Sequence, residues 1–222
     1  MQSGQMTIFD MFDGAKIFNI PKYQRAYAWE ERHLKDFVDD LENQLTDQPE
    51  NQQENKHYFL GTILFQLQPD QGFFKRIDIV DGQQRMTTVI IFMKLLLDRL
   101  QELREDTTIL VETYLQRFGE YKLRVLEQDN TFFQAYILQD HPVIDGAIKT
   151  PSQHRLLAAK QYLASRLQAY NLAELQRLQE KLRSSRILMY SVNNTANATL
   201  IFETTNDRGK QLTNLEKTKS FL

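Results

Sequence analysis

Residues 77–100 constrain the fold of this chain more than any other segment of the sequence. Residues 77–80 (Ile-Asp-Ile-Val) are rich in β-branched side chains, which favour a buried strand. Asp81-Gly82 follows as a turn dipeptide, because glycine accepts backbone angles that other residues resist. From Met86 to Leu100, apolar residues cover nearly every face of a helix, a pattern typical of a buried helix. The sequence therefore predicts a strand, a tight turn and a helix that begins in the protein core.

A helix N-terminus that is held beside a glycine turn can bind an anion, because its free N–H groups point toward the turn. Asp81 and Arg85 flank this position and could hold a divalent metal and a phosphate. Gln83 and Gln84 could hydrogen-bond a ribose or a base edge, or position a water. The alternatives are that Asp81 caps the helix, that Arg85 pairs with Asp78 or Asp81, and that the two glutamines are polar residues at a helix start.

A second cluster of candidate binding residues lies nearer the N-terminus. Arg25, Tyr27 and Trp29 occupy alternate positions, so a cation and two aromatic rings lie close together in the chain. Arginine and aromatic rings together suit a base, a ribose or a DNA backbone. The alternative is that the tyrosine and the tryptophan pack in the core while the arginine lies at the surface.

A third candidate is the loop that contains Asn206, Arg208 and Gly209. A glycine loop between two helices can offer backbone N–H groups and positive charge to phosphates. An ordinary glycine cap at the end of a helix would also explain Gly209. Both interpretations stay open at this level.

The pattern along the chain predicts an α/β (α+β) fold, with a single domain over residues 1–222. Strands are expected at 16–21, 58–67, 73–80 and 186–192, a hairpin turn at 69–72, and helices at 30–45, 86–103, 196–205 and from 212 onward. Residues 106–185 have the pattern of helices, so we expect an α/β core of residues 1–105 and 186–222 with a large helical insertion. The chain stops at Leu222 inside an apolar helical pattern, which predicts a truncated piece of a longer protein.

Composition narrows the function classes. The formal net charge of −2 over 222 residues argues against a broad basic face that grips nucleic acid through phosphates alone. The absence of cysteine excludes disulfides, thiolate zinc sites and cysteine catalysis, and it suits a reducing cytoplasm. No apolar run reaches the roughly 20 residues that cross a bilayer, so we expect a cytoplasmic protein with no membrane partner.

Four motifs in a fixed order carry a resemblance to a known family. They are Pro21–Trp29 (PKYQRAYAW), Tyr58–Ile63 (YFLGTI), Asp81–Arg85 (DGQQR) and Phe202–Leu212 (FETTNDRGKQL). Together they resemble the N-terminal domain of GmrSD-type modification-dependent restriction proteins, from about Ile17 to Leu222. The resemblance implies a ParB/sulfiredoxin-like core with a small mixed sheet and a large helical insertion. Relatives carry a nuclease in a following domain, which is absent from this chain.

The resemblance also implies a nucleoside triphosphate site, because residues 82–85 are similar to the Gly-x-x-Arg phosphate motif of ParB-like domains. Asp81 is then the key acid and a ligand of Mg²⁺ or another divalent cation, Arg85 binds phosphate, and Gln84 completes the catalytic set. The implied nucleotide-binding residues are Gly82, Gln83, Arg25, Tyr27, Trp29, Asn206, Arg208 and Gly209. Sulfinic-acid repair, the sulfiredoxin reaction, is excluded because the chain has no cysteine.

We therefore expect an NTP-binding and NTP-hydrolysing regulatory domain of a DNA-modification-dependent restriction system that acts in phage defence. The expected partners are a nucleoside triphosphate, DNA, and a nuclease domain or subunit, while a homo-oligomer is left open. Two other function classes remain. One is a module that binds nucleotide or modified DNA without turnover, and the other is an interaction scaffold whose helical insertion recruits other subunits.

Overall fold

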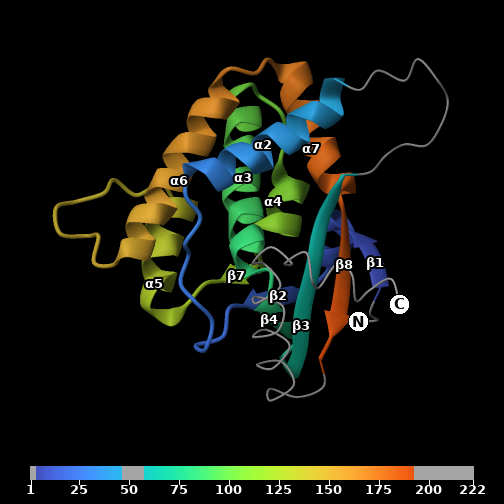
Figure 1. Ribbon diagram of the computed structural model, residues 1–222, viewed down its shortest axis with the longest axis vertical. Coiled ribbons are helices and arrows are strands. Elements are labelled where there is room, and N and C mark those ends of the chain that lie inside the picture. Colours follow the sequence, from blue (N-terminus) through green and yellow to red (C-terminus); the bar gives the residue numbers. More distant parts are fainter. Residues whose placement is uncertain (1–3, 47–57, 193–222) are drawn as a thin grey trace, which may run out of the picture.

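The computed structural model describes residues 4–46 and 58–192, and Figure 1 shows a mixed sheet packed against a group of helices. The strands of the main sheet lie in the order β1 (Gly4–Thr7), β8 (Arg186–Ser191), β3 (Phe59–Gln71), β4 (Phe74–Asp81), β2 (Lys16–Asn19) and β7 (Leu123–Arg124). β3 and β4 form an antiparallel hairpin, and β1 pairs antiparallel with β8. The pairs β3–β8, β2–β4 and β2–β7 are parallel. The predicted α+β class with a small mixed sheet is confirmed.

The central helix is α3 (Gln83–Glu102), which follows β4 directly. Ile77 and Ile79 of β4 are fully buried in the same hydrophobic cluster as the apolar residues of α3. Helices α2 (Glu31–Thr46), α6 (Pro151–Gln168) and α7 (Leu172–Ser184) complete the helical layer, and α3 contacts both α6 and α7. In Figure 1, α2 crosses in front of α3. This enclosure explains why nearly every face of α3 is apolar.

Local sequence signals set where several helices begin. Asn171 and Glu174 form a capping box at the start of α7, in which each side chain binds the other residue's backbone N–H. Thr150 caps α6, and Pro151 occupies its first turn, where no amide hydrogen is needed. These caps set the first residues of α6 and α7.

The predicted hairpin is confirmed, but its turn is shifted. Gln71 pairs with Phe74, so the two-residue loop is Gly72-Phe73, and Pro69 lies inside β3 instead of in the turn. The pairing is irregular between Gln68 and Gln71, which is where a proline that has no N–H is tolerated.

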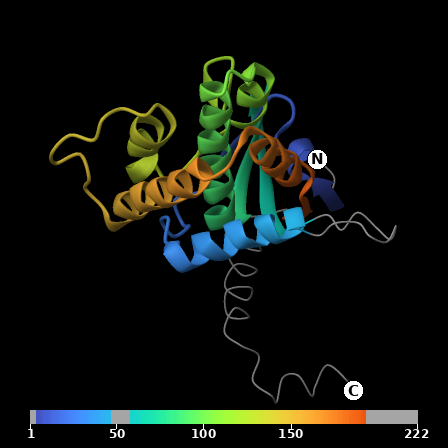
Figure 2. The ribbon, with the colours of Figure 1, turned by 90° about the horizontal axis from the view of Figure 1, so that it is seen from above.

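The prediction of helices alone between residues 107 and 185 is wrong in part. This segment contains α4 (Thr108–Tyr114), α5 (Glu127–Phe132), the π-helix η1 (Phe133–Leu138), α6 and α7, but also the hairpin β5 (Gln116–Arg117) and β6 (Glu120–Tyr121) and the strand β7. β7 joins the main sheet beside β2. Figure 2 shows that α6 and the segment before it project to one side of the molecule.

The N-terminal elements β1 and α1 (Ile8–Phe12) were not expected from the sequence. α1 is held by a capping box between Thr7 and Asp10. The helices predicted at 196–205 and from 212 onward lie outside the described residues. Among the helices of the described ranges, none combines the length and the apolar content that crossing a membrane requires.

Candidate functional site

The turn between β4 and α3 has the tight geometry that the sequence predicts. Gly82 lies at φ 94°, in the left-handed region that glycine favours, and its carbonyl accepts the first helical hydrogen bond from Met86 N–H at 2.9 Å. A β-carbon at this position would lie 3.1 Å from Cγ1 of Ile63 on β3. Glycine is therefore required both for the backbone angle and for close contact with the neighbouring strand.

Arg85, on the first turn of α3, lies against the backbone of β3. Its Nη1 donates a hydrogen bond to the carbonyl of Thr62 at 3.1 Å, and a β-carbon at Gly61 would lie 2.8 Å from the same nitrogen. Burial lowers the pKa of the Arg85 guanidinium, while Asp81 and Tyr58 nearby act in the opposite direction. The guanidinium is thus held in place mainly by backbone, so its remaining N–H donors are available to a ligand.

The predicted alternative, in which Arg85 pairs directly with an acid, is not found within residues 4–46 and 58–192. Asp78 instead accepts hydrogen bonds from Asn19 at 3.2 Å and from Gln68 at 2.9 Å. Asp81, at the end of β4, acts on Arg85 electrostatically without an ion-pair contact. An arginine without a carboxylate partner is better suited to bind an anion.

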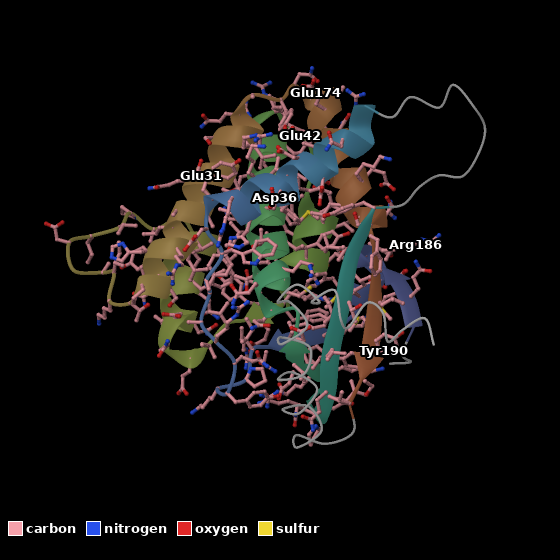
Figure 3. All side chains as sticks on the ribbon, viewed as in Figure 1. Glu31, Asp36, Glu42, Glu174, Arg186 and Tyr190 are labelled. Atoms are coloured by element: carbon pink, nitrogen blue, oxygen red, sulfur yellow. The ribbon has the colours of Figure 1, made fainter. Side chains whose placement is uncertain are left out.

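A cleft of about 350 Å³ opens beside Arg85, between α2 and the start of β3. Its walls are both aromatic and charged, and they are formed by Trp29, His33, Asp36, Phe37, Asp40, Tyr58, Phe59, Leu60, Gly61 and Arg85. Residues 29, 33, 36, 37 and 40 recur at helical spacing and so share one face of the helix and its N-terminal approach. Figure 3 shows Asp36 between Glu31 and Glu42 along α2, and Arg186 and Tyr190 at the two ends of β8.

Trp29 forms an aromatic wall of this cleft. Its ring stacks on His33, with the centroids 6.0 Å apart and the planes inclined by 15°, and it also contacts Phe37 at 6.4 Å. The His33 ring is itself held, because its Nδ1 accepts a hydrogen bond from the backbone N–H of Glu30 at 3.1 Å. A flat ring fixed in this way offers a stacking surface.

Among the described residues, two acids line the cleft, Asp36 and Asp40. Tyr58 donates a hydrogen bond to Asp40 at 3.0 Å, and burial, reinforced by Asp40, raises the pKa of the tyrosine hydroxyl. In the part of the chain that the structure describes, no three His, Asp or Glu side chains come close enough to hold a metal by themselves. Asp81 is not among the residues that line the cleft. A single carboxylate fits a divalent cation that arrives with phosphate groups, since Mg²⁺ commonly takes one or two carboxylates plus substrate oxygens.

The second predicted cluster is joined to the first by four hydrogen bonds. The Gln84 amide accepts from Ala28 N–H at 2.7 Å and donates to the Ala26 carbonyl at 3.0 Å. Gln24 donates to the carbonyl of Val80 at 2.5 Å. The fourth bond, at 2.8 Å, joins the hydroxyls of Tyr27 and Thr88. Residues 24–28 are therefore held against the end of β4 and the first turns of α3.

Comparison of the sequence with known protein families identifies the family of the chain. The GmrSD restriction endonuclease N-terminal domain matches residues 8–222 of this chain. The chain belongs to the GmrSD N-terminal domain family. This confirms the resemblance and shows that the chain is part of a restriction system. No curated protein matches the chain. The ParB-like character of the core stays a prediction.

In this GmrSD N-terminal domain, the predicted site residues are divided between two sides of the α3 N-terminus. Trp29 and Arg85 line the open cleft. The other side holds a cavity of only about 10 Å³, lined by Arg25, Tyr27, Gln83 and Gln84 among others. That volume holds roughly one water molecule, so a nucleotide cannot enter there.

The structure also separates the residues of the second cluster by environment. Tyr27 is buried in the core and Arg25 is exposed, as the alternative interpretation of the sequence proposed. Trp29 is half-buried: it packs against the hydrophobic core and also lines the cleft, so its role in binding stays a prediction. The predicted loop residues Asn206, Arg208 and Gly209 lie outside the described residues of this GmrSD N-terminal domain.

Sequence reasoning missed His33, Asp36 and Asp40 as cleft residues, and it gave no role to Tyr58 or Gly61. The helical spacing from Trp29 to Asp40 could have identified His33, Asp36 and Asp40, because it places them on the same side of the helix as Trp29. The motif at residues 58–63 contains Gly61 but gave no structural reason for it, since its role depends on an arginine 24 positions later in the chain.

Proposed function

We propose that this domain binds a nucleoside triphosphate in the cleft beside Arg85. The observation that carries the proposal is the position of the Arg85 guanidinium, which lies on the Gly61 backbone in the wall of a cleft of about 350 Å³. This volume falls within the ~300–1,000 Å³ of ordinary small-molecule sites. The planar guanidinium presents several N–H donors in a geometry that matches phosphate oxygens.

The opposite wall supports a nucleotide in preference to inorganic phosphate alone. The stacked rings of Trp29 and His33 offer an aromatic surface for a base, which contributes ~1–3 kcal/mol per stacked base in nucleic-acid complexes. Arg85 and Trp29 line the same cleft, so a ligand with an anionic end and a flat end can contact both.

Hydrolysis is the second part of the proposal. In this mechanism water attacks the terminal phosphate, and Arg85 and the N–H groups at the start of α3 stabilise the developing negative charge. Asp81 would hold the divalent cation, which offsets the charge of the phosphate oxygens when it is bound. Turnover of the nucleotide would then control a nuclease domain or subunit that cleaves DNA, modified or unmodified.

A measurement of phosphate release tests this proposal. The protein is incubated with each of the four ribonucleoside triphosphates and Mg²⁺, and release is compared between wild type and Asp81→Asn and Arg85→Lys. Asp145→Asn and Arg177→Lys, at exposed positions elsewhere, serve as matched controls. We expect both site variants to lose at least tenfold in rate while the controls match wild type. Unchanged release by Asp81→Asn would refute the assigned site.

Binding without turnover is the second candidate, and a specific observation favours it. Asp81 does not line the cleft, and both polar atoms of the Gln84 amide are engaged by backbone. Two of the three predicted catalytic groups are therefore not part of the cleft wall. A rise in the melting temperature with nucleotide, together with no phosphate release, would identify this function, because a ligand that binds only the folded state stabilises it. No rise with any nucleotide would favour the scaffold.

A further inference from the structure

The Gln84 side chain makes two hydrogen bonds to one short stretch of backbone. Its oxygen accepts from Ala28 N–H at 2.7 Å, and its nitrogen donates to the Ala26 carbonyl at 3.0 Å. The residue is only 6% exposed, so its side chain is largely shielded from water. The amide therefore occupies the place that a neighbouring strand would take beside residues 26–28.

The residues that follow Gln84 and Ala28 in the chain both line the cleft. Gln84 precedes Arg85, which lies in one wall, and Ala28 precedes Trp29, which lies in another. Ala28 is thus tied to the helix that carries the arginine through one side chain. On its other side Trp29 is held by stacking on His33, at the start of α2.

Two neighbouring hydrogen bonds do not involve the backbone of residues 26–28. The Tyr27 hydroxyl meets Thr88 Oγ1 at 2.8 Å, and Gln24 donates to Val80 O at 2.5 Å. Both join a side chain of residues 24–28 to the core, and neither holds the backbone next to Trp29. They anchor the segment but do not set the direction in which Trp29 leaves it.

We infer that Gln84 is a positioning residue that sets the spacing between Trp29 and Arg85 across the cleft. This inference rests on the proposed function only for its ligand, because the placement of Trp29 can be measured without one. It gives Gln84 a role in shaping the site in place of the catalytic role that the sequence implies. Loss of the amide frees Ala28 N–H and the Ala26 carbonyl, and residues 26–29 then move away from α3 to reach other partners.

Trp29 is the single tryptophan of the 222-residue chain, so the fluorescence of the whole protein reports on this residue. The test compares wild type with Gln84→Met, which keeps the side-chain length and removes both hydrogen bonds. Thr88→Val is the matched control, since it removes the buried partner of the Tyr27 hydroxyl and the Thr88 hydrogen bond to the Gln84 carbonyl, but leaves both hydrogen bonds of the Gln84 side chain intact. We expect Gln84→Met to shift the Trp29 emission to longer wavelength and to raise its quenching by acrylamide about twofold. Thr88→Val should do neither.

A second measurement connects the placement of Trp29 to the ligand. The dissociation constant is measured for the nucleotide that binds wild type best. It should rise by about tenfold in Gln84→Met and by less than twofold in Thr88→Val. If wild type binds no nucleotide, the proposed function fails while the emission comparison still decides the role of Gln84.

The inference is overturned if folded Gln84→Met has the emission and quenching of wild type, or if Thr88→Val changes both to the same extent. Circular dichroism and thermal melting establish that each variant is folded. Should Gln84→Met fail to fold, Gln84→Glu takes its place, because it keeps an oxygen for Ala28 N–H and removes only the donor to Ala26. A shift of the Gln84→Glu emission to longer wavelength than wild type, but not as far as that of a fully exposed tryptophan, then supports the positioning role. An emission equal to that of wild type refutes it.

Discussion

The guanidinium of Arg85 lies directly on the α-carbon of Gly61, so that a β-carbon there would be 2.8 Å from Nη1 and 2.9 Å from Cζ. Gly61 adopts φ 104°, and the pairing of β3 with β8 shifts register just before it. The absence of a side chain on β3 thus creates the space in which the arginine lies. The position of Arg85 is determined as much by this glycine as by α3 itself.

Gly61→Ala is therefore expected to displace Arg85 from the wall of the cleft. The substitution adds a clash with the guanidinium and a strained backbone angle, with an expected loss of about 1–3 kcal/mol in the free energy of unfolding. Nucleotide affinity should fall by more than tenfold, as measured by calorimetry. Gly146→Ala is the control, because Gly146 also has a positive φ, 74°, but its β-carbon would meet nothing within 4 Å. Equal nucleotide affinity in the two variants would contradict the role of Gly61.

Trp29→Ala should weaken nucleotide binding by about 1–3 kcal/mol, because a base would lose its stacking partner. Trp29→Phe keeps an aromatic ring and should retain most of the affinity. Phe118→Ala, at an exposed position that does not line the cleft, should bind as wild type does. Isothermal titration with the preferred nucleotide measures all three. Wild-type affinity in Trp29→Ala would show that the base does not stack there.

Lys94→Met should destabilise the fold. Lys94 is 8% exposed, and its ammonium pairs with both Asp98 on α3 and Asp140 after η1. Its removal leaves Asp98 without this partner, whereas Asp140 keeps its pair with Lys160. Because both acids remain partly exposed, we expect a loss of about 1–3 kcal/mol in urea unfolding, below the full cost of breaking a buried pair. Lys35→Met, which removes the exposed Lys35–Asp39 pair, should cost clearly less stability than Lys94→Met, because solvent screens the pair. Similar losses in both variants would contradict the prediction.

Lys122 should make stability depend on pH in the alkaline range. It is fully buried among backbone carbonyls, including that of Phe12 at 3.0 Å, and burial lowers the pKa of its ammonium to about 8. Between pH 8 and 10.5 the unfolded chain keeps this proton while the folded chain has lost it, so the contribution of Lys122 to stability rises with pH. In Lys122→Met this contribution is absent. The free energy of unfolding of wild type, relative to that of Lys122→Met, should therefore increase from pH 8 to 10. Urea titrations at each pH measure this difference. A constant difference would contradict the assignment.

The organisation of the α3 N-terminus follows from local sequence. The β-branched content of residues 77–80, the glycine at position 82 and the continuous apolar pattern of α3 predict the strand, the turn and the buried helix that the structure contains. The four motifs likewise lead to the family, because their order is a property of the chain alone. The three two-residue strands between residues 116 and 124 escaped prediction, since so short a segment has no periodicity to detect.

The sequence by itself determined the strand–turn–helix unit, the mixed α+β class and the family, because each of these depends on neighbours in the chain. Only the tertiary structure decided which side of the α3 N-terminus is open. Successive residues point about 100° apart around a helix, so Gln84 faces the backbone of residues 26–28 while Arg85 faces the cleft. That outcome depends on how α2 and β3 pack around the turn, and such contacts join residues that lie far apart in the sequence.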